Sequence, residues 1–288
     1  MTDGTIDAHM IKLSRRPTSL LLMLGTAVLV AAAFATATNL FSTSAAERSA
    51  DNQSGTGASA GRVYAAPSPA VGALFTRSGG QLGQHFCTAS VVASRTGDLV
   101  ITAAHCVTGV SFSPRGSIVF APGYSDGRFP HGLWAVTRKF VDADWTTRQD
   151  PDDDVAFLSV TPLKSTKKPA GTLEHIAGAE RLRFEARLPL RIHAIGYPDG
   201  SDQAVSCPAK ATSFRPESLH QVMFACPGFT DGTSGGPFLS DFDKATGIGA
   251  IIGVIGGYQQ GGDSPSISYS SAFSASIRTL YEQALKTG

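Results

Sequence analysis

The segment "DGTSGGPF", residues 231–238, holds a serine with one glycine two positions before it and two glycines directly after it. A serine hydroxyl is a weak nucleophile, and it becomes reactive when a general base lies within hydrogen-bond reach and a further group orients that base. Histidine is the usual base, because its pKa lies near neutral pH. Ser234 is therefore a candidate nucleophile. The glycines can expose main-chain N–H groups, so the amides of Gly232 and Ser234 are candidates for an oxyanion hole.

One histidine and one carboxylate have contexts that suit the other two roles. His105, in "LVITAAHCV" (residues 99–107), follows a buried-looking strand and small residues, and a cysteine follows it. Asp154 directly precedes the apolar run 155–158, so it is the acid most suited to enter the interior, where a carboxylate needs a partner. The sequence thus predicts that His105 takes the proton of Ser234 and that Asp154 orients His105.

Three short blocks carry a family resemblance. "TAAHC" (102–106), "DVAFL" (154–158) and "GTSGGP" (232–237) resemble, in this order, the signature blocks of the chymotrypsin/trypsin-like serine proteases. The similarity covers about residues 71–288, and it is nearer to the secreted bacterial branch that includes the glutamyl-endopeptidase group. It implies a serine endopeptidase that hydrolyses polypeptides through His105, Asp154, Ser234 and an acyl-enzyme intermediate. That chemistry needs no metal and no cofactor.

Two positions depart from the family pattern. Thr233 stands where members that are activated by chain cleavage carry an aspartate, which pairs with the freed N-terminus. That activation switch is therefore not expected here. Gly256 stands where many members have a serine that bonds the buried aspartate, so Asp154 is expected to use another donor or a water.

The resemblance also places the substrate-binding residues, which are Gly228, Thr230, Ile255, Gly256 and Gly257. Gly228 occupies the position of the trypsin-type acidic residue. The acid-recognising histidine of glutamyl endopeptidases would fall near Ile255, where there is no histidine. Cleavage after small or apolar residues therefore ranks slightly above the other specificities.

The four cysteines are expected to form two disulfides, because an even number in an exported chain favours pairing. Three pairings are possible, and local closure gives Cys87–Cys106 and Cys207–Cys226. The resemblance supports the first of these. No C-x-x-C pair occurs, so a zinc site is not expected.

We expect the segments that position these residues to form short strands separated by turn residues. Candidate strands span residues 85–94, 98–104, 117–122, 133–141, 155–160, 190–198, 204–214, 219–226, 236–241, 248–258 and 266–273. An all-β fold of two six-stranded antiparallel β-barrels, closed or nearly closed, is predicted at about residues 70–163 and 173–273. Helical spacing of apolar residues predicts one C-terminal α-helix at 274–287.

The N-terminal part differs in composition from the predicted protease domain, residues 70–288. Lys12, Arg15 and Arg16 precede an apolar run at 20–35, which predicts a signal peptide over residues 1–46, with an uncleaved membrane anchor as the alternative. Residues 47–69 are polar and predict a linker or propeptide. We therefore expect a secreted monomer, or a membrane-anchored one outside the cell. The net charge of +1 gives no indication of a nucleic-acid partner.

Two other functions compete with proteolysis. An esterase of the α/β-hydrolase type would use the G-x-S-x-G pattern at residues 232–236, but it needs a histidine after the serine, and none follows Ser234. A catalytically silent binding protein on a protease fold is the other alternative. Loss of a triad residue would be its clearest mark, and all three are present.

Overall fold

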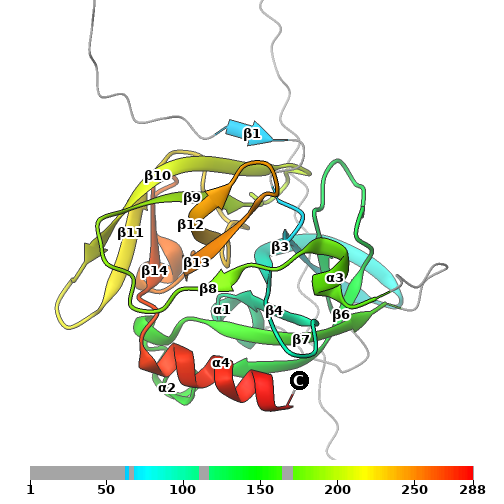
Figure 1. Cartoon of the computed structure of the whole chain (residues 1–288), viewed down its shortest axis with the longest axis horizontal. Coiled ribbons are helices and arrows are strands. Elements are labelled where there is room, and N and C mark those ends of the chain that lie inside the picture. Colours follow the sequence, from blue (N-terminus) through cyan, green and yellow to red (C-terminus); the bar gives the residue numbers. More distant parts are fainter. Residues whose placement is uncertain (1–61, 65–67, 110–116, 164–170, 288) are drawn as a thin grey trace, which may run out of the picture. The chain divides into compact units, whose positions relative to one another are not determined.

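The computed structural model describes residues 62–64, 68–109, 117–163 and 171–287 (Figure 1). The predicted signal peptide or anchor, most of the predicted linker, and residues 110–116, 164–170 and 288 lie outside these ranges. Within the described residues, no helix combines the length and apolar character needed to cross a membrane.

The first half folds into a closed barrel of six antiparallel strands, in the order β2-β3-β4-β7-β6-β5. Its strands are β2 (Val71–Ser78), β3 (Gln81–Val92), β4 (Leu99–Thr102), β5 (Ile118–Pro122), β6 (Trp134–Val141) and β7 (Ala156–Pro162). All residues of β4 and β5 are buried, because these strands face the barrel interior on one side and further structure on the other.

The second half forms a sheet with the order β14-β11-β10-β9-β12-β13-β8. Its strands are β8 (Arg181–Leu182), β9 (Leu190–Gly196), β10 (Ala204–Phe214), β11 (Gln221–Ala225), β12 (Pro237–Asp243), β13 (Ile248–Val254) and β14 (Ile267–Ser271). The Val254 amide donates to Ser270 Oγ at 2.9 Å and the Gly256 amide donates to the Tyr269 carbonyl at 2.9 Å, which joins β13 to β14. These bonds nearly close the six long strands into a second barrel.

Two short strands add to this sheet. β8 pairs parallel to β13, and β1 (Arg62–Tyr64) pairs antiparallel to the start of β10. β1 lies within the predicted linker or propeptide, so this segment contributes a strand to the second sheet.

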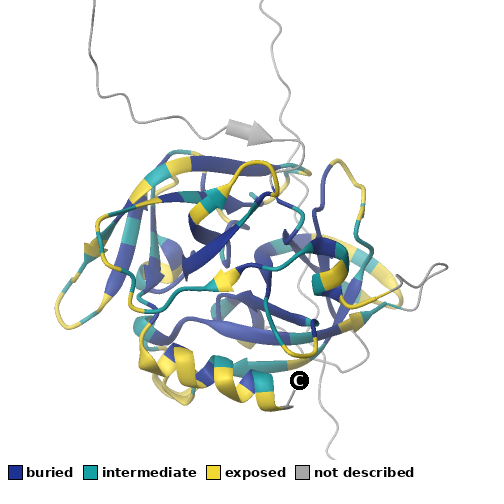
Figure 2. Ribbon diagram, in the orientation of Figure 1, coloured by how far each residue is buried: buried dark blue, intermediate teal, exposed yellow. Residues whose placement is uncertain are grey.

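The remaining described elements are short helices and the C-terminal helix. They are α1 (His105–Thr108), α2 (Ala143–Arg148), η1 (Pro151–Asp153), α3 (Leu173–Ala177), η2 (Tyr258–Gly261) and α4 (Ala275–Thr287). α4 buries Ile277, Leu280 and Ala284 against a hydrophobic cluster that includes residues of both barrels (Figure 2). Two further clusters fill the barrels separately, and each contains one disulfide, Cys87–Cys106 or Cys207–Cys226.

The predicted fold class is confirmed, two antiparallel barrels with a C-terminal helix. Four features of the described residues were not predicted: strand β1, strand β2, the parallel strand β8, and the short helices between strands. The first five residues of β2 are all buried, so the segment lacks the alternation that marks a half-exposed strand.

Candidate active site

Strand pairing in the first barrel brings His105 to Asp154. β4 runs antiparallel to β7, and Thr102 lies opposite Ala156. Three residues beyond Thr102 the chain reaches His105, and two residues before Ala156 it reaches Asp154. Both side chains therefore lie at the same edge of the barrel, although 49 positions separate them in sequence.

Asp154 is fully buried and accepts three hydrogen bonds from protein N–H groups. Its Oδ1 accepts from the His105 amide at 2.9 Å, and its Oδ2 accepts from His105 Nδ1 at 2.8 Å. The Gly257 amide also donates to Oδ2, at 2.8 Å. A buried carboxylate is costly unless it is paired and hydrogen-bonded, and these contacts satisfy both oxygens. Because Gly256 has no hydroxyl to bond Asp154, another donor was expected, and the Gly257 amide is that donor.

The backbone at Gly257 requires glycine. Its φ is +74°, and a Cβ there would come within 2.2 Å of Gln221 Oε1 and 3.0 Å of the Pro151 carbonyl oxygen. Gln221 Oε1 also accepts the Tyr258 amide at 2.9 Å, which fixes the chain after Gly257. The turn from β13 into η2 is thereby shaped to aim one amide at Asp154.

Thr88 of β3 holds the loop around Ser234 against the first barrel. The Thr88 amide donates to the Ser234 carbonyl at 2.7 Å, and Thr88 Oγ1 donates to the Gly232 carbonyl at 3.1 Å. The same Oγ1 accepts the Tyr197 amide at 2.8 Å. One buried side chain thus connects the loop with the end of β9, a role that the sequence did not indicate.

Two main-chain amides in the loop around Ser234 remain available to donate hydrogen bonds. Among the described residues, no acceptor bonds the amide of Gly232 or that of Ser234, whereas the neighbouring amides of Thr233, Gly235 and Gly236 all donate to main-chain carbonyls. Such a pair of unengaged donors beside a serine can stabilise an oxyanion.

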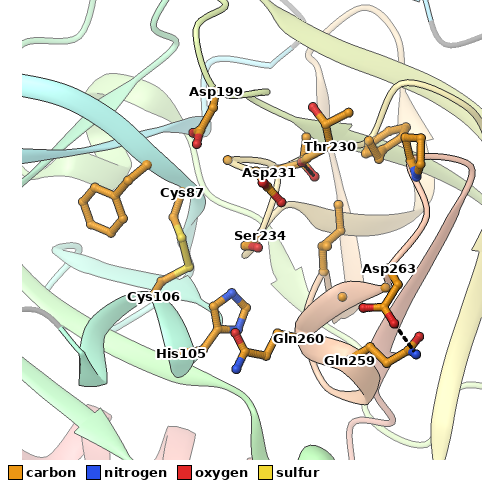
Figure 3. Close-up of a pocket in the computed structure, with 18 of the residues that line it drawn as sticks. Cys87, His105, Cys106, Asp199, Thr230, Asp231, Ser234, Gln259, Gln260 and Asp263 are labelled. Atoms are coloured by element: carbon orange, nitrogen blue, oxygen red, sulfur yellow. Dashed lines mark hydrogen bonds between the residues drawn. A yellow bond between two sulfur atoms is a disulfide. The ribbon is translucent and has the colours of Figure 1, made fainter. Parts of the chain in front are cut away.

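Ser234 and His105 lie together in one cleft, with His105 retaining 14% side-chain exposure (Figure 3). No hydrogen bond links Ser234 Oγ to the His105 ring in the described part of the chain. Contacts of this kind are often long in the absence of substrate and shorten in the Michaelis complex.

The cleft has a volume of about 860 Å³, and it receives residues from both barrels. Of the predicted substrate-binding residues, Thr230 and Ile255 line it, whereas Gly228, Gly256 and Gly257 are not among its lining residues. Asp199, Asp231 and Asp263 also line it, and the sequence had not singled out Asp199 or Asp263. Partial burial raises the pKa of the Asp199 carboxyl above its ordinary value, and the charge of Asp231 acts in the same direction, against the opposing effect of His85.

Thr233, which directly precedes Ser234, is buried. Its Oγ1 donates to the Thr230 carbonyl at 2.6 Å, and its amide donates to the same oxygen at 3.1 Å. The side chain therefore stabilises the loop internally. Because it carries no charge, it cannot form an ion pair with a chain terminus.

One acidic cluster lies outside the cleft. Carboxylate oxygens of Asp142, Asp144 and Asp153 lie within 4.8 Å of one another. Asp142 caps α2 through the Asp144 amide at 2.8 Å, Asp144 pairs with Arg148 at 2.9 Å, and Asp153 accepts from Ser276 Oγ at 2.7 Å. These contacts give each carboxylate a structural partner, so we assign no metal to the cluster.

The sequence pattern of the family described as "Trypsin-like peptidase domain" matches residues 87–248, which is more than half of the chain. The chain therefore belongs to this family. It is a serine endopeptidase, and its substrates are polypeptides. No curated protein matches the sequence.

Solved structures of proteases share the fold. The protease Anisep from Arthrobacter nicotinovorans is 21% identical, with a TM-score of 0.64 over 79% of this chain and 100% of that chain. The thermostable serine protease AL20 from an extremophilic microorganism is 26% identical, with a TM-score of 0.62 over 77% of this chain and 99% of that chain. A Glu endopeptidase is 18% identical, with a TM-score of 0.56 over 77% of this chain and 92% of that chain.

Proposed function

We propose that this serine endopeptidase is secreted and cleaves peptide bonds through His105, Asp154 and Ser234. The observation that carries the proposal is the double attachment of His105 to Asp154, at 2.9 and 2.8 Å, in the cleft that also contains Ser234. A histidine held in this way keeps its Nδ1–H on the carboxylate, which leaves Nε2 as the free base.

In the first step, Ser234 Oγ attacks the scissile carbonyl carbon and its proton passes to His105 Nε2. The carbonyl oxygen becomes an oxyanion that the amides of Gly232 and Ser234 bind. The C–N bond then breaks, His105 gives its proton to the leaving amine, and an acyl-Ser234 ester remains. Water attacks this ester with His105 again as base, which releases the acid and restores the serine. Asp154 stabilises the imidazolium in both halves of the reaction.

The residue before the scissile bond is proposed to be small or apolar. Thr230, Ile255 and Phe229 line the cleft without a charge, and the Asp263 carboxylate on the side of Thr230 already accepts a hydrogen bond from Gln259 Nε2 (Figure 3). The trypsin-type acidic position is Gly228, so no carboxylate stands there to bind a basic side chain at this subsite.

Export is proposed from two observations. The apolar segment near the N-terminus follows three basic residues, as in a signal peptide. The two disulfides fit an extracellular protein, because such bonds persist in oxidising compartments. We propose a monomer, because the reaction needs only residues of one chain.

The proposal is tested by proteolysis with matched variants. Ser234→Ala and His105→Ala are expected to reduce cleavage of a denatured protein substrate by at least about 10³-fold. Ser213→Ala, on the exposed part of β10, is the control for a serine lost elsewhere. Comparable proteolysis by Ser234→Ala and by the control would refute the assignment of the nucleophile.

A further inference from the structure

Asp199 occupies a defined side of the cleft. Figure 3 shows Asp199 and the Cys87–Cys106 disulfide on one side of Ser234, with Thr230 and Asp263 on the other. Phe86 also lines the cleft and directly precedes Cys87. This side therefore combines an aromatic ring, a disulfide and a carboxylate.

The Asp199 carboxylate lies against the proposed oxyanion hole. The main-chain amide of Asp199 donates to the carbonyl of Asp231, the residue before Gly232, at 2.7 Å. A Cβ added to Gly232 would come within 2.4 Å of Asp199 Oδ1, which places the carboxylate beside the Gly232 Cα. A group bound by Asp199 would thus lie next to the scissile bond.

The loop that carries Asp199 is held by the first barrel. His85 Nε2 donates to the Ser201 carbonyl at 2.9 Å, and the Asp126 amide donates to the Asp202 carbonyl at 2.9 Å. The Tyr124 hydroxyl donates to Asp202 Oδ1. These contacts fix the position of Asp199 without engaging its carboxylate, since no donor among the described residues bonds its oxygens. Asp263, by contrast, accepts from Gln259 Nε2 at 2.5 Å.

The chemistry of the reaction indicates which part of the substrate reaches Asp199. His105 must protonate the leaving nitrogen, so the segment after the scissile bond departs on the side of His105. Cys106 follows His105 directly, and its disulfide partner Cys87 adjoins Phe86. Figure 3 shows the Cys87–Cys106 disulfide between His105 and Asp199, so a segment that leaves past His105 along this disulfide would approach Asp199.

We propose that Asp199 binds a cationic side chain, lysine or arginine, at the first substrate residue after the scissile bond. The inference rests on the proposed function. A lysine or arginine stem can pack on Phe86 while the charged group reaches the carboxylate. No lysine or arginine lines the described cleft, and His85, which acts electrostatically on Asp199, directs its Nε2 to the Ser201 carbonyl rather than to the carboxylate. Asp199 and Asp231 both oppose negative charge beside Gly232, and a substrate cation there would offset their repulsion of the oxyanion.

The test uses protein produced from the full 288-residue chain and fluorogenic peptides that differ only in the first residue after the scissile bond. The kcat/KM for lysine is expected to exceed that for glutamine about fivefold, as for an exposed ion pair. High salt should reduce this ratio. Asp199→Asn should bring the ratio to about one, and Asp199→Lys should reverse the preference toward glutamate. Asp241→Asn, on an exposed aspartate that pairs with Arg183 instead, is expected to keep the lysine preference.

Two failures can be told apart by labelling Ser234 with a fluorophosphonate in the same samples. If Ser234 is labelled and peptides are cleaved, but lysine and glutamine substrates react equally or Asp199→Asn keeps the preference, the role of Asp199 is wrong and the proposed function stands. Absence of both labelling and cleavage overturns the proposed function, and the Asp199 inference with it.

Discussion

His105 is attached to Asp154 at two points, through its main-chain amide and through its ring. The amide contact to Oδ1 is 2.9 Å and the Nδ1 contact to Oδ2 is 2.8 Å. One buried carboxylate therefore fixes both the backbone at the start of α1 and the orientation of the imidazole. Removing the charge of Asp154 should therefore disturb both the position of His105 and the tautomer of its ring.

Asp154→Asn is expected to lower kcat by about 10³–10⁴-fold. Three N–H groups point at the two carboxylate oxygens, so the amide NH₂ of an asparagine must face at least one donor. Either the imidazole loses its Nδ1–H acceptor, or the NH₂ group faces the His105 amide and displaces the backbone that carries the ring. Steady-state kinetics with a peptide substrate measures the effect, and a loss below tenfold would contradict it.

Gly257→Ala should reduce both stability and kcat. A Cβ there would collide with Gln221 Oε1 at 2.2 Å, so the amide that donates to Asp154 must move. We expect a loss of about 1–3 kcal/mol in the free energy of unfolding, together with lower kcat. Gly79→Ala is the matched control, because Gly79 also has positive φ, +59°, but nothing lies within 4 Å of its Cβ position. Equal effects of the two changes on kcat would show that strain alone explains the result.

The sequence was sufficient to predict the fold, and it singled out the residues of the proposed triad, because both inferences depend on local signals. Short apolar strands mark the barrels, and His105 and Asp154 adjoin two of these strands. Gly257 and Thr88 act through main-chain and side-chain contacts across the two barrels, which no local pattern reveals. Asp199 lies in a turn of ordinary composition, and only the folded chain brings its carboxylate beside Gly232.

The two disulfides should differ in their effect on catalysis. Each closes a loop of the same length, with a sequence separation of 19, so each should stabilise the chain by about 3 kcal/mol in the chain-entropy model. Cys87 and Cys106 line the cleft, whereas Cys207 and Cys226 do not. Replacing either pair by alanine should therefore lower the urea midpoint similarly, while only loss of Cys87–Cys106 lowers kcat. Equal losses of kcat in the two folded double variants would contradict this.

Glu180 should make stability depend on pH. It is fully buried, its Oε2 accepts the Gly249 amide at 2.5 Å, and its Oε1 has no partner among the described residues. Burial raises the pKa of its carboxyl from 4.5 to about 7. The folded chain therefore holds this proton more tightly than the unfolded chain does. The resulting stabilisation is complete below about pH 4.5 and is lost as the pH rises through about 7.

Glu180→Gln tests this dependence, because glutamine keeps an acceptor for Gly249 and cannot ionise. Urea unfolding should show the variant close to the wild type at pH 4.5 and more stable than the wild type by about 2–3 kcal/mol at pH 8. If the variant and the wild type differ in free energy of unfolding by the same amount at both pH values, ionisation of Glu180 does not control stability.

The most direct test of the proposed mechanism is to identify the residue that a fluorophosphonate modifies in the folded protein. Intact mass spectrometry and peptide mapping should find one adduct per chain, on Ser234, and His105→Ala should slow its formation by orders of magnitude. An adduct on another serine, or a folded wild-type chain that remains unmodified, would contradict the assignment of Ser234 as the nucleophile.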